Sequence, residues 1–342
     1  KLNLNLSLMT KKILFRADGN VTTGLGHLYR LFALVEMCKR EYDFVFLTKE
    51  SSVLSVIPSD YTLKIIPEEI DINQEPIWID NLFSCKEYIM ISDGYQFSTS
   101  YQKKIKEVGF KLMYIDDLVK EHMFADIVVN HSPHAQENHF TKEPYTKFAL
   151  GTKYALLRPS FLNKNKRIPS SKLDSAFVCF GGADEYNFTH KCVMELLDIP
   201  SIEKINIIIG EAYSFSEIYE VEKKNSKVKI YKNIDERSLY NLMKMCNFGI
   251  APTSTILFEL ISVNMYLVSG FYVENQRKAY HELESRNVFK GIGDFNTYQF
   301  NFLKNYILNL SPTIIQKQIE SQKTLIDGNQ KRRFLTLLNE LN

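Results

Sequence analysis

From Lys11 onward, short apolar runs alternate with longer amphipathic stretches, and few folds accommodate this alternation. It is typical of β–α–β units, in which parallel strands form a sheet and helices cover both of its faces. Short runs with few polar residues suit strands that are buried on both sides. In the first half of the chain, the runs predict strands at Lys12–Arg16, Asp43–Leu47, Leu63–Ile66, Tyr88–Ser92, Lys111–Ile115 and Asp126–Val129.

A helix is expected between the first two strands. Its apolar residues recur at spacings of three, four and seven, which places them on one helix face. They are Leu28, Leu31, Leu34, Val35 and Cys38. The helix should begin near His27, so the segment DGNVTTGLGH joins a strand directly to a helix.

The alternation starts again after a polar segment, Asn163–Ser175, whose Pro, Ser and charged residues are typical of a linker. A chain of 342 residues also exceeds what one hydrophobic core usually organises. We therefore expect two domains, residues 9–162 and residues 175–342, joined by residues 163–174. Met9 is the expected natural start of the first domain.

The second half predicts another parallel sheet. Its expected strands are Ser175–Phe180, Lys204–Ile209, Val228–Tyr231, Phe248–Ala251 and Met265–Ser269. The expected helices are Phe188–Leu197, Glu236–Met245, Thr255–Val263, Phe302–Leu310, Thr313–Leu325 and Asn329–Leu341. The last helix can pack back on the first domain. The prediction is an α/β protein of two Rossmann-like parallel-sheet domains facing a central cleft, where the carboxyl ends of the strands hold a ligand.

Charge and cysteine content argue against several classes of protein. Lys plus Arg number 42 and Asp plus Glu 40, a formal charge of +2, so there is no cationic excess for binding nucleic acid. No apolar run reaches the length of about 18 residues that a membrane-spanning helix needs. The five cysteines are scattered, without a C-x-x-C pair, which argues against disulfides and zinc. The opening residues lack the apolar core of a secretory signal, so we expect a cytoplasmic protein.

Three of the 14 glycines lie between residues 19 and 26, directly before the first expected helix. Gly24 and Gly26 let a ligand approach the backbone, and a helix start offers unpaired N–H groups to an anion. The loop is not a P-loop, because Leu25 follows Gly24. It is not a dinucleotide fingerprint either, because Tyr29 stands at the third glycine position. A tight turn without a ligand remains the alternative.

His27 follows these glycines, in the first turn of the expected helix. The positive end of a helix favours a neutral imidazole, which can act as a base. The alternative is a solvent-facing cap residue. Asp93 and Tyr95 follow the expected strand Tyr88–Ser92, at the sheet edge where open α/β folds hold ligands. Tyr95 is suited either to orient a substrate hydroxyl or to pack as a lid on the loop surface.

Gly181 and Gly182 repeat the strand–glycine–helix pattern in the second half. Further along, three hydroxyl residues stand where a helix starts, a position that suits a diphosphate: Thr253, Ser254 and Thr255. Glu259 lies about one turn further on, where its carboxylate can accept both ribose hydroxyls. A capping box is the alternative, but it needs Ser or Thr three residues before the Glu, and Ile256 occupies that position.

The spacing of the histidines and carboxylates does not predict a metal site. Asp116 and Asp117 are adjacent, so in an extended chain their side chains point to opposite faces, and we interpret them as a helix cap and a solvated charge. His131, His134 and His139 lie in a polar stretch and are interpreted as solvated loop residues. We expect neither a metal nor a cofactor.

Several motifs, taken in order, resemble a known family, the UDP-2,4-diacetamido-2,4,6-trideoxy-β-L-altropyranose hydrolases of pseudaminic acid biosynthesis. The motifs are ILFRADGNVTTGLGHLYR, SDGYQ, YIDDL, YALLRPSF, FGGADE, TSTILFEL, VENQ and LIDGNQKRRF. They extend from Lys12 to the C-terminal helix. The resemblance implies a GT-B-like fold, related to the N-acetylglucosaminyl transferase that makes the lipid-linked peptidoglycan precursor. It also implies UDP release with inversion at the anomeric carbon, without a metal.

The resemblance also implies roles for individual residues. His27 matches the catalytic histidine, and Tyr95 and Asn275 match the other catalytic positions. Ser254, Thr255 and Glu259 match the family's diphosphate and ribose positions. With the residues singled out above, the full set expected to bind the substrate and UDP is Gly24, Gly26, Asp93, Gly181, Gly182, Thr253, Ser254, Thr255, Glu259 and Gln276. The expected partners are a UDP-sugar and water, with no nucleic acid and no membrane insertion, and we expect a monomer.

Two departures from the family pattern affect substrate preference. TST replaces a more usual pair of small residues before the nucleotide helix, and Asp18, Gly19 and Asn20 stand where serines are common. Two other functions stay open: a GT-B glycosyltransferase that uses a UDP-amino sugar, and a catalytically silent nucleotide-sugar binder. Catalytic UDP release from a UDP-diacetamido sugar without an acceptor is expected of the hydrolase alone.

Overall fold

The computed structural model describes residues 11–20, 24–162 and 172–342. The chain divides into two compact units. The first contains the chain up to Leu156 together with Asn329–Asn342, and the second is Leu157–Gly328. Met9 and residues 163–171 of the expected linker lie outside the described residues.

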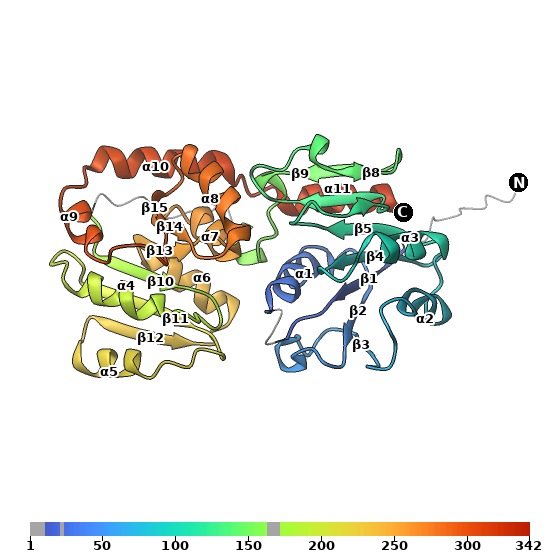
Figure 1. The fold of residues 1–342 in the computed structure, drawn as a ribbon, viewed down its shortest axis with the longest axis horizontal. Coiled ribbons are helices and arrows are strands. Elements are labelled where there is room, and N and C mark those ends of the chain that lie inside the picture. Colours follow the sequence, from blue (N-terminus) through green and yellow to red (C-terminus); the bar gives the residue numbers. More distant parts are fainter. Residues whose placement is uncertain (1–10, 21–23, 163–171) are drawn as a thin grey trace, which may run out of the picture. The chain divides into compact units, whose positions relative to one another are not determined.

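The first unit is built on parallel strands in the order β3-β2-β1-β4-β5-β7-β9 (Figure 1). The strands are β1 Lys12–Ala17, β2 Phe44–Lys49, β3 Leu63–Ile66, β4 Tyr88–Asp93, β5 Lys111–Ile115, β7 Ile127–Asn130 and β9 Lys147–Leu150. The six strands expected from the sequence are therefore confirmed, and β9 is additional. The strand order reverses beside β1, with β2 on one side and β4 on the other, which is the point where α/β folds bind ligands.

Helices and short elements complete the first unit. The helices are α1 Gly26–Cys38, α2 Glu75–Leu82, α3 Thr99–Glu107 and α11 Gln330–Leu341. The short elements are the 3₁₀ helices Leu54–Val56, Glu137–His139 and Thr152–Tyr154, and the paired strands β6 His122–Met123 and β8 Thr141–Lys142. α1 begins at Gly26, next to the expected start near His27. Its buried apolar face packs on β1 and β4.

The core of the first unit is formed by apolar residues from its strands. Leu14, Leu47, Met90 and Leu112 are all fully buried, and each comes from a different strand. This agrees with the sequence, in which the strands are short apolar runs with few polar residues, as expected of strands buried on both faces. Ile105 of α3 closes the same core. Apolar packing therefore stabilises the middle of the sheet, and polar residues lie at its carboxyl edge.

The second unit repeats this arrangement, with parallel strands in the order β12-β11-β10-β13-β14-β15. The strands are β10 Ser175–Cys179, β11 Lys204–Ile209, β12 Val228–Lys232, β13 Phe248–Pro252, β14 Tyr266–Phe271 and β15 Lys290–Asp294. The helices are α4 Phe188–Leu197, α5 Glu217–Lys224, α6 Glu236–Met245, α7 Thr255–Ser262, α8 Glu274–Ser285, α9 Phe302–Leu308 and α10 Pro312–Leu325, with a 3₁₀ helix at Pro159–Leu162. The order reverses between β10 and β13.

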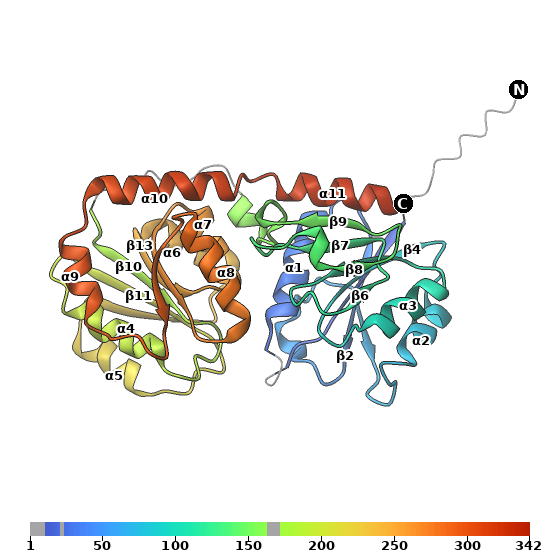
Figure 2. The same cartoon turned by 45° about the horizontal axis from the view of Figure 1, so that its top comes forward.

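Two consecutive helices belong to different units: α10 lies on the second unit and α11 on the first (Figure 2). In α10, Gln318 accepts a hydrogen bond from the Leu267 N–H at 2.7 Å and donates one to the Leu267 carbonyl at 3.1 Å, which fixes the helix to β14. In α11, the fully buried Phe334 packs against the Tyr154 ring. Asn339 accepts from the Tyr42 hydroxyl at 2.6 Å. The chain thus returns to complete the first unit.

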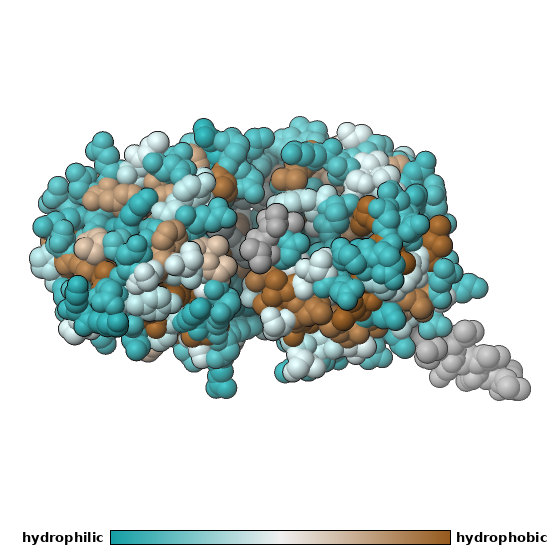
Figure 3. All heavy atoms as spheres, turned by 60° about the horizontal axis from the view of Figure 1, so that its bottom comes forward, coloured by the Kyte–Doolittle hydropathy of each residue, from teal (hydrophilic) through white to brown (hydrophobic). Residues whose placement is uncertain are grey.

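Apolar side chains also gather on the surface of the first unit in the view of Figure 3. On the edge strand β3, Leu63 and Ile65 are 37% and 39% exposed. Lys64 stands between them, and a charge on an edge strand discourages pairing with a further strand. Among the helices that the structure describes, none combines the length and the apolar character that crossing a membrane requires.

Candidate active site

Glycines shape the described part of the loop between β1 and α1. Gly24 has a φ of +76°, a left-handed conformation that favours glycine. A Cβ atom at Gly24 or Gly26 would meet no atom of the described residues within 4 Å, so the backbone borders open space in this part of the structure. The loop leads into α1, whose first turn holds His27. There is therefore room for a ligand beside the start of α1.

His27 is held by side chains from two elements. Its Nδ1 lies 2.7 Å from Oδ1 of Asp93, the last residue of β4. Arg30, one turn further along α1, donates from Nε to Asp93 Oδ2 at 2.9 Å and from Nη2 to Oδ1 at 2.6 Å. The Asp93 side chain is fully buried, and those of His27 and Arg30 are each 8% exposed. These three residues are called the His27 cluster below.

Asp117 and Tyr95 border the His27 cluster. Asp117, which follows β5, accepts from Arg30 Nη1 at 2.7 Å and from the Tyr95 hydroxyl at 3.3 Å. The Tyr95 ring meets the His27 ring edge-on, with centroids 4.5 Å apart. Burial and the negative charge of Asp117 raise the pKa of Tyr95 to about 12. Tyr95 therefore keeps its proton at neutral pH and can donate it in a hydrogen bond.

Asp93 is ionised at neutral pH. Burial alone would raise its pKa, but the charge of Arg30 and the hydrogen bond from His27 outweigh burial and lower it. A buried carboxylate is tolerated only when it is paired and hydrogen-bonded, and Asp93 has both kinds of partner. The His27 imidazole therefore lies against a fixed negative charge.

The two adjacent carboxylates after β5 do not serve as the sequence predicted. Asp116 accepts from the Val119 N–H and from Asn130 Nδ2, each at 3.0 Å, and burial raises its pKa. It therefore closes a turn instead of capping a helix. Asp117 pairs with Arg30 and is only partly exposed, so it is not a solvated charge. Their side chains do go to different partners, as expected for neighbours in an extended chain.

A second charged network fixes the residues just before the loop. Arg16, fully buried in β1, donates from Nε to Glu75 Oε1 at 2.7 Å and from Nη2 to Oε2 at 2.9 Å. Its Nη1 donates to Asp18 Oδ1 at 2.5 Å. Asp18 also accepts from the Lys49 N–H at 2.7 Å and from Gln96 Nε2 at 3.0 Å. Asp18 thereby connects the loop to β2 and to the segment after β4.

His131 follows β7 at the same edge of the sheet. Burial, with a further contribution from the Arg30 charge, lowers the pKa of His131 to about 4. His131 and His134 are both partly buried, which contradicts their interpretation as solvated loop residues, whereas His139 is exposed as expected. His131 is therefore neutral at pH 7. Among the described residues, no group of His, Cys, Asp and Glu is arranged to hold a metal ion.

In the second unit, glycines follow β10. Gly181 has a φ of +86°, and a Cβ atom at Gly181 or Gly182 would meet no atom within 4 Å among the residues that the structure describes. Gly210, after β11, is required for packing instead, because a Cβ there would come within 2.5 Å of the Gly182 Cα. Asp184 accepts from the N–H groups of the first turn of α4, at 2.9 and 2.7 Å. Backbone open to a ligand thus borders a well-fixed helix start.

The start of α7 is where the hydroxyl residues lie. Ser254 is the N-cap, and its side chain makes no capping hydrogen bond within the described structure. Thr255 is the first helical residue. The hydroxyl of Thr253 is buried and donates to the Gly270 carbonyl at 3.1 Å, so it serves the contact between β13 and β14. The N-cap hydroxyl is therefore better placed for a ligand than that of Thr253.

Glu259 is almost fully buried within α7 and is paired with Arg158. Arg158 donates from Nε to Oε1 at 2.8 Å and from Nη2 to Oε2 at 2.6 Å. The Glu259 side chain is 4% exposed and that of Arg158 is 23% exposed. Two parallel hydrogen bonds fix the carboxylate plane. The pair also attaches the residues before Pro159–Leu162 to α7.

Asn275 and Gln276 lie in the first turn of α8, which follows β14. Asn275 is exposed, whereas Gln276 accepts from the Tyr272 N–H at 3.2 Å and so closes the helix start. In each unit, the candidate residues therefore gather at the carboxyl edge of the sheet. The first-unit set is Gly24, Gly26, His27, Asp93 and Tyr95, and the second-unit set is Gly181, Gly182, Thr253, Ser254, Thr255, Glu259, Asn275 and Gln276.

Sequence reasoning missed three charged residues at these edges: Arg30, Asp117 as the partner of Arg30, and Arg158. One signal was present for Arg30, which lies three residues after His27 and so on the same helix face. YIDDL and YALLRPSF were noticed as motifs, but nothing in them indicates which partner Asp117 or Arg158 binds.

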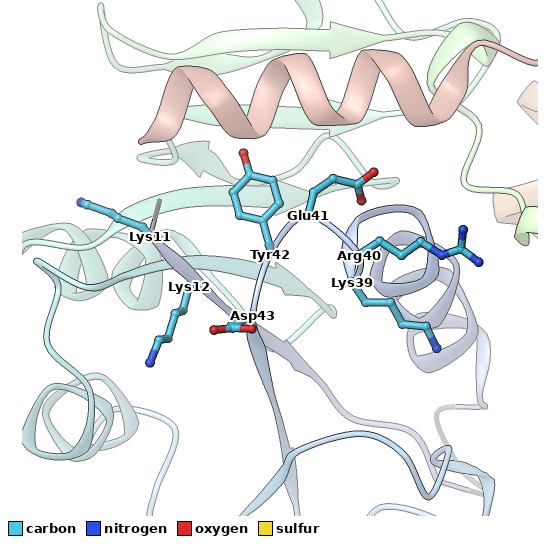
Figure 4. A pocket seen from close by; sticks show the side chains of 7 residues that line it. All are labelled: Lys11, Lys12, Lys39, Arg40, Glu41, Tyr42 and Asp43. Atoms are coloured by element: carbon cyan, nitrogen blue, oxygen red, sulfur yellow. The ribbon is translucent and has the colours of Figure 1, made fainter. Parts of the chain in front are cut away.

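A pocket at the opposite edge of the first sheet is unrelated to these residues. Its volume is about 200 Å³, and Figure 4 shows its lining side chains around the turn between α1 and β2: Lys11, Lys12, Lys39, Arg40, Glu41, Tyr42 and Asp43. Two of the cations have partners, because Lys11 donates to the Cys85 carbonyl and Lys39 pairs with Asp60. The pocket lies at the amino ends of the strands, away from the His27 cluster.

The chain has a GT-B-like fold, with two parallel-sheet units that each carry polar residues at the carboxyl edge. Solved structures of glycosyltransferases share this fold. MurG of Acinetobacter baumannii has a TM-score of 0.67 at 11% identity, covering 96% of this chain and 99% of MurG. HepE of Anabaena, crystallised in complex with UDP, has a TM-score of 0.62 at 13% identity, covering 96% and 100%. The calicheamicin glycosyltransferase CalG4 has a TM-score of 0.64 at 8% identity, covering 97% and 98%.

Two relatives are similar in sequence. The spore coat polysaccharide biosynthesis protein SpsG of Bacillus subtilis is 23% identical over 266 residues, 76% of this chain and 77% of SpsG. An uncharacterised protein of Methanocaldococcus jannaschii is 27% identical over 287 residues, 79% of this chain but 58% of that protein. This chain thus corresponds to little more than half of the archaeal relative. No protein-family model matches the chain.

Proposed function

We propose that this protein hydrolyses a UDP-linked 2,4-diacetamido-2,4,6-trideoxyhexose to the free sugar and UDP, with inversion at the anomeric carbon. This reaction belongs to pseudaminic acid biosynthesis, and it uses neither a metal nor a cofactor. One observation carries the proposal: the imidazole of His27 is paired with a buried carboxylate in the first turn of a helix, beside a loop whose glycines border open space.

His27 acts as the general base. Its Nε2 takes a proton from water while the water oxygen bonds to the anomeric carbon, and the bond from that carbon to UDP breaks with its electron pair going to UDP. Attack on the face opposite UDP inverts the carbon. His27 then loses the proton to solvent. Tyr95, which borders His27 and keeps its own proton, and Asn275 hold the sugar and the leaving oxygen.

The second unit binds the nucleotide. The start of α7 presents the positive end of the helix and the hydroxyls of Ser254 and Thr255 to the diphosphate. Gly181 and Gly182 allow close approach of the backbone. Glu259 receives the ribose through the acceptor lone pairs that its two hydrogen bonds from Arg158 leave over. The UDP in the similarly folded HepE and the polysaccharide-biosynthesis role in the name of SpsG support a UDP-sugar as the substrate.

A glycosyltransferase that uses a UDP-amino sugar is the second candidate, because solved structures similar to this chain include glycosyltransferases. In that reaction, His27 would deprotonate an acceptor hydroxyl in place of water. A silent nucleotide-sugar binder is disfavoured by the orienting contacts around His27, which binding alone does not require.

The test is UDP release from the purified protein with a UDP-diacetamido-trideoxyhexose and no acceptor. The hydrolase should turn over many equivalents, and NMR of the first-formed sugar should show the anomeric configuration opposite to that of the substrate. UDP-N-acetylglucosamine serves as a control for substrate selectivity. Release that needs an added acceptor would indicate the transferase, and tight binding without release would indicate the binder.

A further inference from the structure

We propose that Asp93 is a positioning residue that holds the Nδ1 proton of His27 and so leaves Nε2 as the basic nitrogen, and that Arg30 keeps Asp93 in place and ionised. The inference deepens the proposed function and rests on it, because His27 is the base of that reaction. It makes Asp93 a residue that orients the base, whereas the sequence analysis expected Asp93 to bind the substrate.

The geometry leaves Asp93 little capacity for a substrate. Its Oδ1 is 2.7 Å from His27 Nδ1 and 2.6 Å from Arg30 Nη2, and its Oδ2 is 2.9 Å from Arg30 Nε. The side chain is fully buried. A carboxylate held on both oxygens in this way is fixed in plane and orientation. Asp93 therefore acts on a substrate only through His27.

The protonation of Asp93 decides the tautomer of His27. An ionised carboxylate only accepts hydrogen bonds, so at 2.7 Å the shared proton must sit on Nδ1. Arg30 Nη2 also lies 2.8 Å from Nδ1, and a guanidinium only donates. Nη2 has two hydrogens and so can reach both Asp93 and Nδ1. If Nδ1 had no hydrogen, however, its lone pair would face those of Asp93 Oδ1 at 2.7 Å, so the assignment that avoids this repulsion is Nδ1–H donating to Asp93. Nε2 then carries the free electron pair.

The charges around His27 also bear on the proton transfer that the proposed reaction requires. Arg30 carries one positive charge, and Asp93 and Asp117 carry one negative charge each, which leaves a single net negative charge. The imidazolium formed by proton transfer cancels it. Two further groups beside the cluster are neutral at pH 7: Tyr95, whose ring meets His27, and His131, whose electrostatic environment includes Arg30, Asp117 and Asp93. Asp116, next to Asp117, is held by the Val119 N–H and Asn130 instead. Such prearranged charge stabilises a transition state in which charge develops.

The experiment compares the wild-type protein with Asp93→Asn, an isosteric change that removes the charge. ¹⁵N-labelled histidine reports the tautomer of each of the seven histidines by NMR, and the signal absent from His27→Asn identifies His27. In the wild type, we expect a proton on Nδ1 and a free Nε2. In Asp93→Asn, the amide can donate to Nδ1, so the proton should move to Nε2.

Turnover provides the second readout. Asp93→Asn should lower kcat by about 10²- to 10⁴-fold, the scale expected when a base is held in the wrong tautomer. UDP affinity should stay unchanged, and the acid limb of the pH–rate profile should move to lower pH. Asp43→Asn is the matched control, because Asp43 is exposed at the opposite edge of the sheet. It should leave the tautomer, kcat and pH profile unchanged.

The two proposals can fail separately. A wild-type His27 with its proton on Nε2 overturns the positioning role even if no variant folds, because this measurement needs only the wild type. An Asp93→Asn protein with wild-type kcat and pH profile also overturns it, while the hydrolase proposal stands. If the wild type releases no UDP but shows the expected tautomer, the hydrolase proposal fails and the geometry of the pair is upheld.

Discussion

In the proposed reaction, His27 acts through one nitrogen, so its removal should affect the chemical step more than binding. Replacing His27 with Asn keeps a hydrogen-bonding group beside Asp93 but removes the base. We expect kcat to fall by about 10²- to 10⁴-fold, with UDP affinity near that of the wild type. Steady-state kinetics and calorimetry with UDP check the two parts. Wild-type kcat in a folded His27→Asn protein would return His27 to the role of a helix-start residue.

His131 makes the stability of the first unit depend on pH. Burial and the Arg30 charge lower its pKa from 6.5 to about 4. Between these values, the unfolded chain binds a proton that the folded chain does not. The free energy of unfolding should therefore decrease as the pH falls, by about 2 kcal/mol between pH 7 and pH 5.

Trp78 of α2 allows this to be measured in the first unit alone, because it is the single tryptophan of the chain. Urea unfolding followed by Trp78 fluorescence at pH 7 and pH 5 should show the decrease in the wild type. The decrease should be much smaller in His131→Gln, which has no proton to gain in this range. Equal decreases in the two proteins would mean that other groups cause it.

The position of many candidate-site residues along the chain could be predicted from the sequence, but not which side chains bind one another. Glycines before a helix indicated open backbone, and the placement of His27 in the first turn of α1 was correct. Two salt bridges fix these residues, and each joins residues distant in sequence. Asp93, the partner of His27, pairs with Arg30, and Glu259 pairs with Arg158. A periodic pattern carries no information about such pairs, because they depend on the order of strands in the sheet.

Helices and strands were predicted from the sequence where they carry enough apolar residues, and were missed where they do not. The helices α4 and α6 have the bounds that the sequence predicted, since each presents a continuous apolar face. The helix α8 was not expected, because only Tyr280 and Leu283 of its 12 residues are buried. β15, with the sequence KGIGD, was also missed: glycines and charges give no strand signal, and its pairing with β14 defines it.

Glu259 of α7 is proposed to bind the ribose and also pairs with Arg158. One variant tests both roles. Glu259→Gln keeps the shape of the side chain and one acceptor for Arg158. If Glu259 receives the ribose, UDP binding should weaken by about 1.5 to 3 kcal/mol, the value of a hydrogen bond to a charged group. Calorimetry measures this. Glu217→Gln, on the exposed first turn of α5, is the control.

An unchanged UDP affinity in Glu259→Gln, together with a lower unfolding midpoint, would limit Glu259 to fixing Arg158. Weaker UDP binding without a change in stability would support the ribose role. The conservative Gln is preferred to Ala, because Ala would leave the largely buried Arg158 without its bidentate partner.

For the whole molecule, the first unit depends on a helix from the far end of the described chain. Phe334 of α11 is fully buried against Tyr154. Phe334→Ala should lower the free energy of unfolding of the first unit by about 3 to 5 kcal/mol. Trp78 fluorescence during urea unfolding should report the loss. Ile314→Ala, an exposed position on α10 of the second unit, should leave the Trp78 transition unchanged.

The return of α11 to the first unit also sets an order of events on the ribosome. Residues 157–328, the entire second unit, are synthesised before α11 emerges. During that interval, the surface of α1 that α11 covers is open, and Tyr42 and Lys147 lack their partners Asn339 and Glu340. The nascent first unit therefore exposes this surface until α11 is synthesised, and a stalled ribosome would prolong that exposure.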